Sequence, residues 1–230
     1  TSNAFNIQSD YSDKMTIGGT VNKTFLTLMI LIGSAYYSWT YISIINVLLL
    51  PAVIGGFIVA IITIRKKEWA PITVPIYGVL QGIFLGIISN VFNAMYDGIV
   101  ITAISYTLCI LFALLSVYRL GIIKPTENFK LGLAAATGGI AIVYLANFII
   151  SFFGSGIPLM DINNSSMYSI GFSVFVIVIA SMNLVVDFDF IEEGAEKGAP
   201  KYMEWYGAFG LMVTLVWLYL EILKLLAKMN

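Results

Sequence analysis

The sequence predicts an all-α membrane protein with seven transmembrane helices. Of its 230 residues, 59% are hydrophobic and only 11% are charged, whereas a soluble domain carries roughly a quarter charged residues. The mean hydropathy is +0.92. Long apolar runs alternate with short polar connections, and lysine and arginine fall in every second connection. These observations predict the fold class and make the lipid bilayer the first expected partner.

The spans follow from the lengths of the apolar runs, because a helix needs about 20 apolar residues to cross a bilayer. The runs of suitable length cover 24–41, 44–64, 71–92, 99–119, 130–153, 168–190 and 206–228. Only SWTYISI divides the first two, so six spans are the main alternative. Residues 24–64 are too many for one tilted helix, which favours two spans. We expect a polar N-terminal segment, residues 1–23, and a seven-helix transmembrane domain, residues 24–230.

Basic residues predict the orientation of these spans. They lie before the first span and after the second, fourth and sixth: Lys14, Lys23, Arg65, Lys66, Lys67, Arg119, Lys124, Lys130, Lys197 and Lys201. The other three connections carry none. Because basic residues favour the cytoplasmic side, this alternation predicts a cytoplasmic N-terminus and a C-terminus outside. Lys224 and Lys228 break the pattern, since they fall at the outward end of the last span.

Composition also excludes several classes of function. Histidine is absent, which removes Ser–His and Cys–His nucleophile pairs and the commonest ligand of transition metals. The net charge of −1 gives no reason to expect a nucleic-acid partner. No P-loop, dinucleotide-binding or hydrolase motif occurs in the connections. We therefore expect neither an enzyme nor a bound cofactor.

Small residues mark the faces on which helices can pack closely in lipid. Gly78, Gly82 and Gly86 recur every four residues, and LGLAAATGG (131–139) is a second small-residue stretch. We expect the stripe formed by Gly78, Gly82 and Gly86 to pack against other helices of the same chain rather than against a second copy.

Three of the acidic residues fall within apolar runs, where ionisable groups are costly and usually functional. Asp187 continues a helical stripe through Ser173, Ala180 and Asn183; alternatively, it is a helix-end carboxylate in water, paired with Lys201. Asp189 points about 200° away from Asp187 on the same helix, and we expect it at the cytoplasmic interface.

Glu221 is the third acid within an apolar run, and Lys224 follows at the spacing of a helical ion pair. One interpretation is a pair near the outer interface whose two side chains both extend towards water. The other is an acid that faces a pathway through the protein.

Three stretches are typical of one known family. They are LVVDFDFI (184–191), LYLEILKLL (218–226) and, more loosely, TIRKKEW (63–69). Together with the seven spans, they resemble the transmembrane Bax inhibitor motif family over about residues 20–228, most closely its prokaryotic members. The resemblance implies that the last helix is surrounded by the other six. It also implies a place in the bacterial cytoplasmic membrane.

The activity that the resemblance implies is a passive, pH-sensitive calcium leak without a resident cofactor. In the family, an acid at the end of span six shares a proton with an acid in the last helix. An arginine after span two is thought to latch the closed pore by bridging to these acids. Asp187 matches the first acid, with Ile191 in the expected place after it, and would bind Ca²⁺ weakly. Arg65 is the best match to the arginine of the family, and Lys66 is the alternative match.

The second acid of the family can be matched in two ways. If LYLE is aligned with the Leu-Tyr-Leu-Asp stretch of the family, Glu221 becomes the partner of Asp187. If the end of the last helix is aligned instead, Thr214 occupies the position of the second acid, and this alignment needs a shorter insertion in the chain. We prefer Thr214. When two carboxylates share a site, the repulsion between their charges raises the pKa of one of them. With threonine as the partner, we therefore expect a pH dependence that is weaker or more acidic than in relatives with two aspartates.

A function of a different class is a non-conducting membrane partner that modulates a membrane protease or other quality-control machinery. It requires an exposed docking segment. The candidates are MTIGGTVNK (15–23) and EEGAEKGAPKYMEW (192–205).

Overall fold

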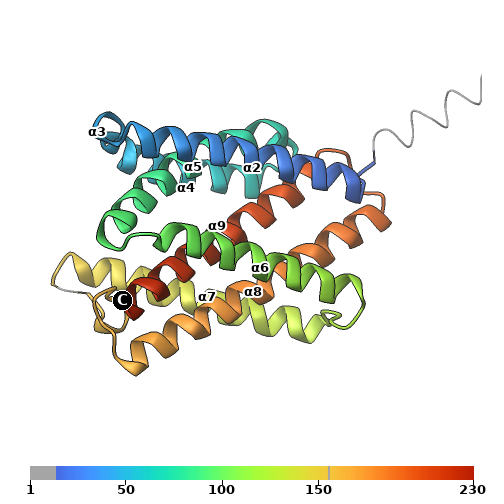
Figure 1. Cartoon of the computed structure of the whole chain (residues 1–230). Helices are drawn as coiled ribbons and strands as arrows, with labels where there is room; N and C mark the ends of the chain where they lie inside the picture. The colour runs from blue at the N-terminus through green and yellow to red at the C-terminus, as the bar shows by residue number, and fades with distance from the viewer. Residues whose placement is uncertain (1–13, 155) are drawn as a thin grey trace, which may run out of the picture. The chain divides into compact units, whose positions relative to one another are not determined.

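The computed structural model describes residues 14–154 and 156–230, and helices make up most of these residues (Figure 1). Seven helical stretches are long and apolar enough to cross a membrane: Ile17–Thr40, Asn46–Arg65, Lys67–Met95, Ile99–Arg119, Glu127–Ser151, Met167–Glu196 and Met203–Met229. They correspond to α2 (Ile17–Thr40), α4 (Leu49–Arg65), α5 (Ala70–Met95), α6 (Ile99–Arg119), α7 (Glu127–Ser151), α8 (Met167–Glu196) and α9 (Met203–Met229). The predicted fold class is confirmed, and the chain is an integral membrane protein.

Short helices lie in the connections: α3 (Ile42–Ile45), η1 (Asn46–Leu48), η2 (Lys67–Trp69) and η3 (Pro158–Met160). The division between the first two spans falls at Tyr41, which ends α2 and precedes α3. The alternative of six spans is therefore wrong.

The first span begins earlier than its apolar run indicates. Thr16 has an extended backbone, and its side chain accepts a hydrogen bond from the backbone N–H of Gly19 at 3.0 Å. This N-cap stabilises the first turn, so α2 starts at Ile17, within the polar segment 1–23. Residues 1–13 of that segment lie outside the described part of the chain. Capping thus places the polar residues 17–23 in the first helix.

The sixth span ends later than its apolar run indicates. The helix α8 continues to Glu196 because nothing in FIEEGAE breaks it, and an ion pair between Glu193 and Lys197 supports its last turn. Asp187 and Asp189 therefore lie well inside α8 rather than at its end.

The chain forms two compact units. Among the described residues, the first comprises those up to Val91 together with Asp187–Val213, and the second comprises those of 92–186 together with Thr214–Asn230. The helices α8 and α9 contribute to both units. Among the seven spans, α9 has the largest buried share, 61% of its most apolar stretch, whereas α7 has only 11%.

The glycine stripe of α5 packs against α2 within the first unit (Figure 1). A Cβ atom at Gly78 would lie 3.2 Å from Thr27 Cγ2, and one at Gly82 would lie 2.6 Å from Ser34 Cβ. At Gly86 it would lie 2.9 Å from the backbone carbon of Ala35. No side chain fits at Gly82 or Gly86 unless the helices move apart. The predicted packing within one chain is confirmed for this stripe.

The second small-residue stretch behaves differently. In α7, an added Cβ at Gly132, Gly138 or Gly139 would meet nothing within 4 Å among the described residues. These glycines are exposed. Small residues thus permit a close helix contact but do not require one.

Candidate functional site

Asp187 lies in α8 with its carboxylate turned towards α9 in the first unit. A Cβ atom at Gly210 would lie 3.1 Å from Asp187 Oδ1. Glycine at this position of α9 therefore gives the carboxylate room against the helix backbone. Lys201, the alternative partner in water, forms an ion pair with Glu204 at 2.9 Å. This geometry turns the Asp187 carboxylate towards α9, and both Asp187 and Asp189 are half-exposed.

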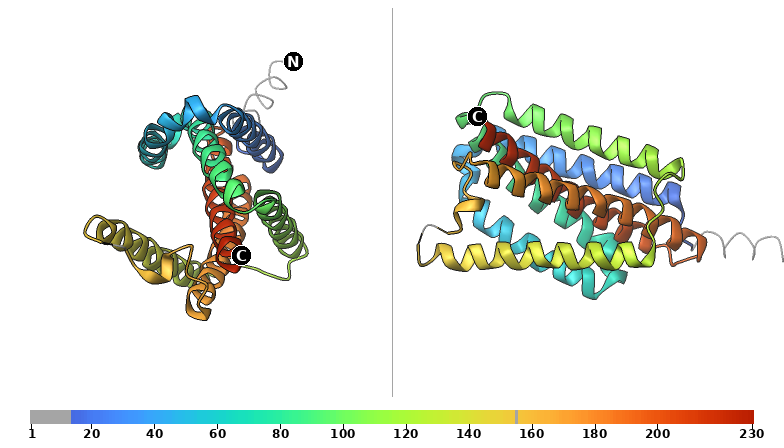
Figure 2. Two further views of the ribbon diagram at one scale, coloured as in Figure 1. Left: turned by 60° about the vertical axis from the view of Figure 1, so that its left-hand side comes forward. Right: turned by 90° about the horizontal axis from the view of Figure 1, so that it is seen from below.

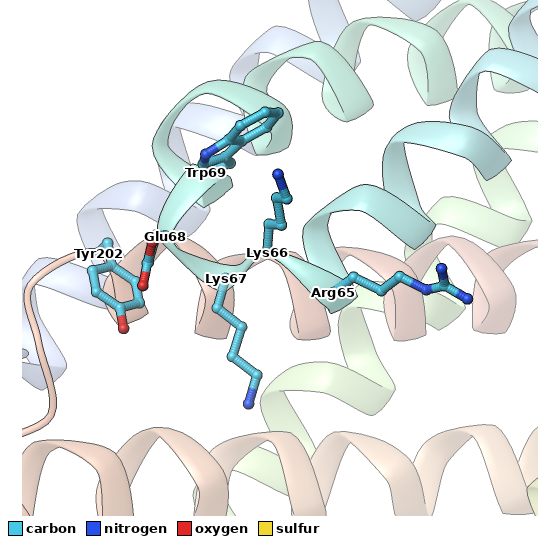
Figure 3. Close-up of a pocket in the computed structure, with 6 residues that line it drawn as sticks. All are labelled: Arg65, Lys66, Lys67, Glu68, Trp69 and Tyr202. Atoms are coloured by element: carbon cyan, nitrogen blue, oxygen red, sulfur yellow. The ribbon is translucent and has the colours of Figure 1, made fainter.

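Arg65 ends α4 and lines a pocket of about 410 Å³ together with Lys66, Lys67, Glu68, Trp69 and Tyr202 (Figure 3). The ammonium of Lys66 lies 4.3 Å from the centre of the Trp69 ring. Lys67 lies 5.1 Å from that of Tyr206. In the part of the chain that the structure describes, Arg65 has no such ring contact, and its side chain points away from both lysines (Figure 3). Cation–π contacts stabilise the observed positions of the two lysines, whereas Arg65 extends away from both of them (Figure 3).

Three of the basic segments meet at one end of the first unit. The backbone N–H of Met15 donates to Ala199 O at 2.7 Å, which joins the start of α2 to the α8–α9 connection. Lys23 lies 5.1 Å from the centre of the Trp205 ring. The pocket beside Arg65 includes Tyr202 of the same connection. The alternation of basic connections predicts that these segments lie on the same side of the membrane, and their meeting agrees with this. That this side is the cytoplasmic side stays a prediction.

Glu221 and Lys224 form the predicted ion pair in the second unit, with 2.9 Å between Oε1 and Nζ. Glu221 is only 2% exposed, whereas the Lys224 side chain is 36% exposed and its ammonium lies 4.8 Å from the centre of the Tyr144 ring. The interpretation that both side chains extend towards water is wrong for the carboxylate, which is enclosed by protein. Thr214, the preferred match to the second acid, is also buried.

Glu204 is a buried charge that the sequence reasoning missed, because it was placed with the acids of the connections. It is 1% exposed at the start of α9. Its Oε1 accepts hydrogen bonds from Thr16 N at 3.0 Å and Thr16 Oγ1 at 2.9 Å, and it pairs with Lys201. A Cβ atom at Gly19 would overlap this carboxylate. The carboxylate thus fixes the N-terminus of α2, where a negative charge is favourable.

We expect Glu204→Gln to loosen the start of α2. The amide loses the charge that strengthens the bonds to Thr16 and Lys201, and hydrogen bonds to charged groups contribute about 1.5–3 kcal/mol. Amide hydrogen exchange of the first turn of α2 measures the effect, with faster exchange expected. Glu196→Gln, at an exposed position of α8, is the matched control and should leave this exchange unchanged. Equal protection in Glu204→Gln and the wild type would show that the carboxylate does not hold the helix.

Lys228 is the second buried charge that was missed, and it lies near the other end of α9. It is 3% exposed, and its ammonium is bonded to three oxygen atoms of the second unit. Lys228 and Lys224 broke the charge alternation, and that irregularity was the available sequence signal. Each is bonded within the protein, which explains why the alternation fails at these two residues.

Within the described residues, no three Cys, Asp or Glu side chains come together as metal ligands. A tight resident calcium site would need several such oxygen donors. The weak calcium site at Asp187 and the latch between Arg65 and Asp187 stay predictions.

Comparison with known proteins is consistent with this arrangement. A family model described as Bax inhibitor 1 like matches residues 1–230, the whole chain. No curated protein and no solved structure matches the chain. The match therefore includes the seven spans, the Asp187 region of α8 and the whole of α9. The chain belongs to the Bax inhibitor 1 like family.

Proposed function

We propose that this protein is not an enzyme but a passive, pH-sensitive leak for cations, with calcium as the transported ion. Asp187 is the acid of the pathway, and Arg65 is the charge that latches the closed state. The observation that carries the proposal is the position of Asp187. This residue lies within the length of α8, and its carboxylate lies against Gly210 of α9. An acid turned towards the most buried span of a membrane protein is a strong functional candidate.

We assign Thr214 rather than Glu221 to the position where relatives have the second acid, because that match needs the shorter insertion. Thr214 follows Gly210 by about one helical turn, whereas Glu221 lies roughly 16 Å further along α9 than Gly210. Glu221 also has its own ion pair with Lys224. We therefore propose Asp187 as the carboxylate that a cation meets beside this stretch of α9. One carboxylate with neutral oxygen donors binds calcium weakly, as conduction requires.

The alternative function, a non-conducting partner of a membrane protease, needs a free docking segment. Both candidate segments are bonded to each other. Met15 is buried and donates to Ala199, and Thr16 donates to Glu204. A segment occupied in this way offers fewer groups to a partner protein, so the contacts favour conduction. We also propose that the protein lies in the bacterial cytoplasmic membrane with its N-terminus in the cytoplasm.

Calcium flux into proteoliposomes tests the latch. We expect Arg65→Ala to raise the leak about two- to fivefold at neutral pH, because an exposed ion pair contributes roughly 0.5–1 kcal/mol. Lys66→Ala is the matched control, since Lys66 lies over Trp69, and it should leave the leak unchanged. A larger increase with Lys66→Ala than with Arg65→Ala would assign the latch to Lys66. A leak unchanged by either substitution would contradict the latch altogether.

A further inference from the structure

The side chain of Lys228 enters a set of oxygen atoms near the end of α9. Its Nζ lies 3.0 Å from Leu159 O, 3.3 Å from Ser169 O and 3.0 Å from Ser173 Oγ. Two of these oxygens come from α8, and the third comes from η3 in the connection before it. This end of α9 lies beside that connection (Figures 1 and 2). Residues far apart in the sequence therefore surround one ammonium group.

The oxygen set matches a cation closely. An ammonium has three N–H donors and no acceptor, and here each donor has one oxygen. Backbone carbonyl and hydroxyl oxygens are also the ligands that replace the hydration shell of hard cations. The distances of 3.0–3.3 Å exceed the roughly 2.3–2.6 Å of calcium–oxygen bonds. The site therefore suits a larger monovalent cation, of the size of ammonium or potassium.

The position of Lys228 argues against simple anchoring. A lysine in the last turn of a membrane helix can extend its ammonium towards water, and the neighbouring Met229 and Asn230 are exposed. Lys228 instead points inward and is 3% exposed, although burying a charge costs several kcal/mol unless it is compensated. Glu221 and Asp161 are near enough to attract the ammonium, and Lys224 is near enough to repel it.

We propose that Leu159 O, Ser169 O and Ser173 Oγ form a site for a small monovalent cation, which Lys228 occupies as a tethered ammonium. The lysine closes this end of α9 to free cations. Binding at the site does not depend on conduction, but the further step, that the ammonium competes with a permeating ion, rests on the proposed function.

Chemical rescue of Lys228→Ala tests the site directly. The substitution leaves the oxygens without their cation, so the purified variant should unfold at a lower temperature than the wild type. Methylammonium, ammonium or K⁺ should restore that temperature, whereas tetramethylammonium should not, because its methyl groups make it too large to bring its charge close to the oxygens. Lys197→Ala is the matched control, since the Lys197 side chain is 72% exposed, and it should show no rescue. Loss of stability without rescue by any small cation would overturn the proposal and leave Lys228 as an anchor.

Two further readouts keep the test decisive. If Lys228→Ala does not accumulate in folded form, extraction in ammonium should recover it, and failure to recover it would count against the site. Ser173→Ala added to Lys228→Ala should weaken the rescue, because it removes one of the three oxygens.

Flux separates this site from the proposed function. Lys228→Ala should raise the leak of K⁺ severalfold in proteoliposomes if the ammonium blocks a path. Rescue in detergent with no leak from either the wild type or Lys228→Ala would leave the cation site standing and reject the conducting role. A leak that depends on Asp187 but is unchanged in Lys228→Ala, with no rescue, would reject the cation site alone.

Discussion

Gly82→Leu is expected to prevent α2 and α5 from packing and to leave little folded protein. A Cβ atom at Gly82 would lie 2.6 Å from Ser34 Cβ and closer still to the backbone oxygen of Leu31. A backbone oxygen cannot rotate away as a side chain can, so the two helices must separate. Extra methylene groups in a packed interior already cost about 1–3 kcal/mol, and a whole leucine side chain costs more. The yield of monodisperse protein in detergent and its unfolding temperature measure the loss.

The matched control for this substitution is Gly138→Leu in α7. A Cβ atom at Gly138 would meet nothing within 4 Å in the described part of the chain. The control should therefore yield folded protein that unfolds near the wild-type temperature. A Gly82→Leu variant as stable as Gly138→Leu would show that the α2–α5 contact is not what holds the first unit together.

Thr214→Asp is expected to create a pH switch near neutrality. Two carboxylates that share a poorly hydrated site cannot both ionise easily, so one of the pair keeps its proton to higher pH. Under the proposed function, the midpoint of the calcium leak should move towards neutral pH by about one unit or more. Flux into proteoliposomes, measured between about pH 5 and 8, gives the midpoint.

Glu221→Gln is the control for that experiment. The proposal places Thr214, not Glu221, beside Asp187, so removing the charge of Glu221 should leave the wild-type midpoint in place. A midpoint that shifts in Glu221→Gln but not in Thr214→Asp would make Glu221 the partner of Asp187 instead.

The spans could be predicted from the sequence because a segment in lipid must be a long apolar run whose backbone N–H and C=O groups are hydrogen-bonded within the helix. The glycine stripe of α5 was predictable for a similar reason, since its four-residue period places Gly78, Gly82 and Gly86 on one helix face. The ends of α2 and α8 were not predictable from hydropathy. A cap at Thr16 and a charged but helical FIEEGAE extend these helices beyond their apolar parts.

The buried charges were harder to predict because their partners are distant in sequence. Glu204 is hydrogen-bonded to Thr16, 188 residues away, and Lys228 to Leu159, 69 residues away. Local spacing carries no information about such pairs. The ion pair of Glu221 with Lys224 was predictable because it lies within one helical turn. Its burial was not, since burial depends on which face of α9 meets the rest of the second unit.

The measurement that tests the proposed function most directly compares calcium leak through Asp187→Asn and Asp189→Asn in proteoliposomes. The two substitutions remove the same charge from opposite faces of one turn of α8, but Asp187 is the acid that lies against Gly210 of α9. We predict that Asp187→Asn falls to the leak of protein-free liposomes, whereas Asp189→Asn keeps most of the wild-type leak. A wild-type leak through Asp187→Asn would contradict the central role of this carboxylate.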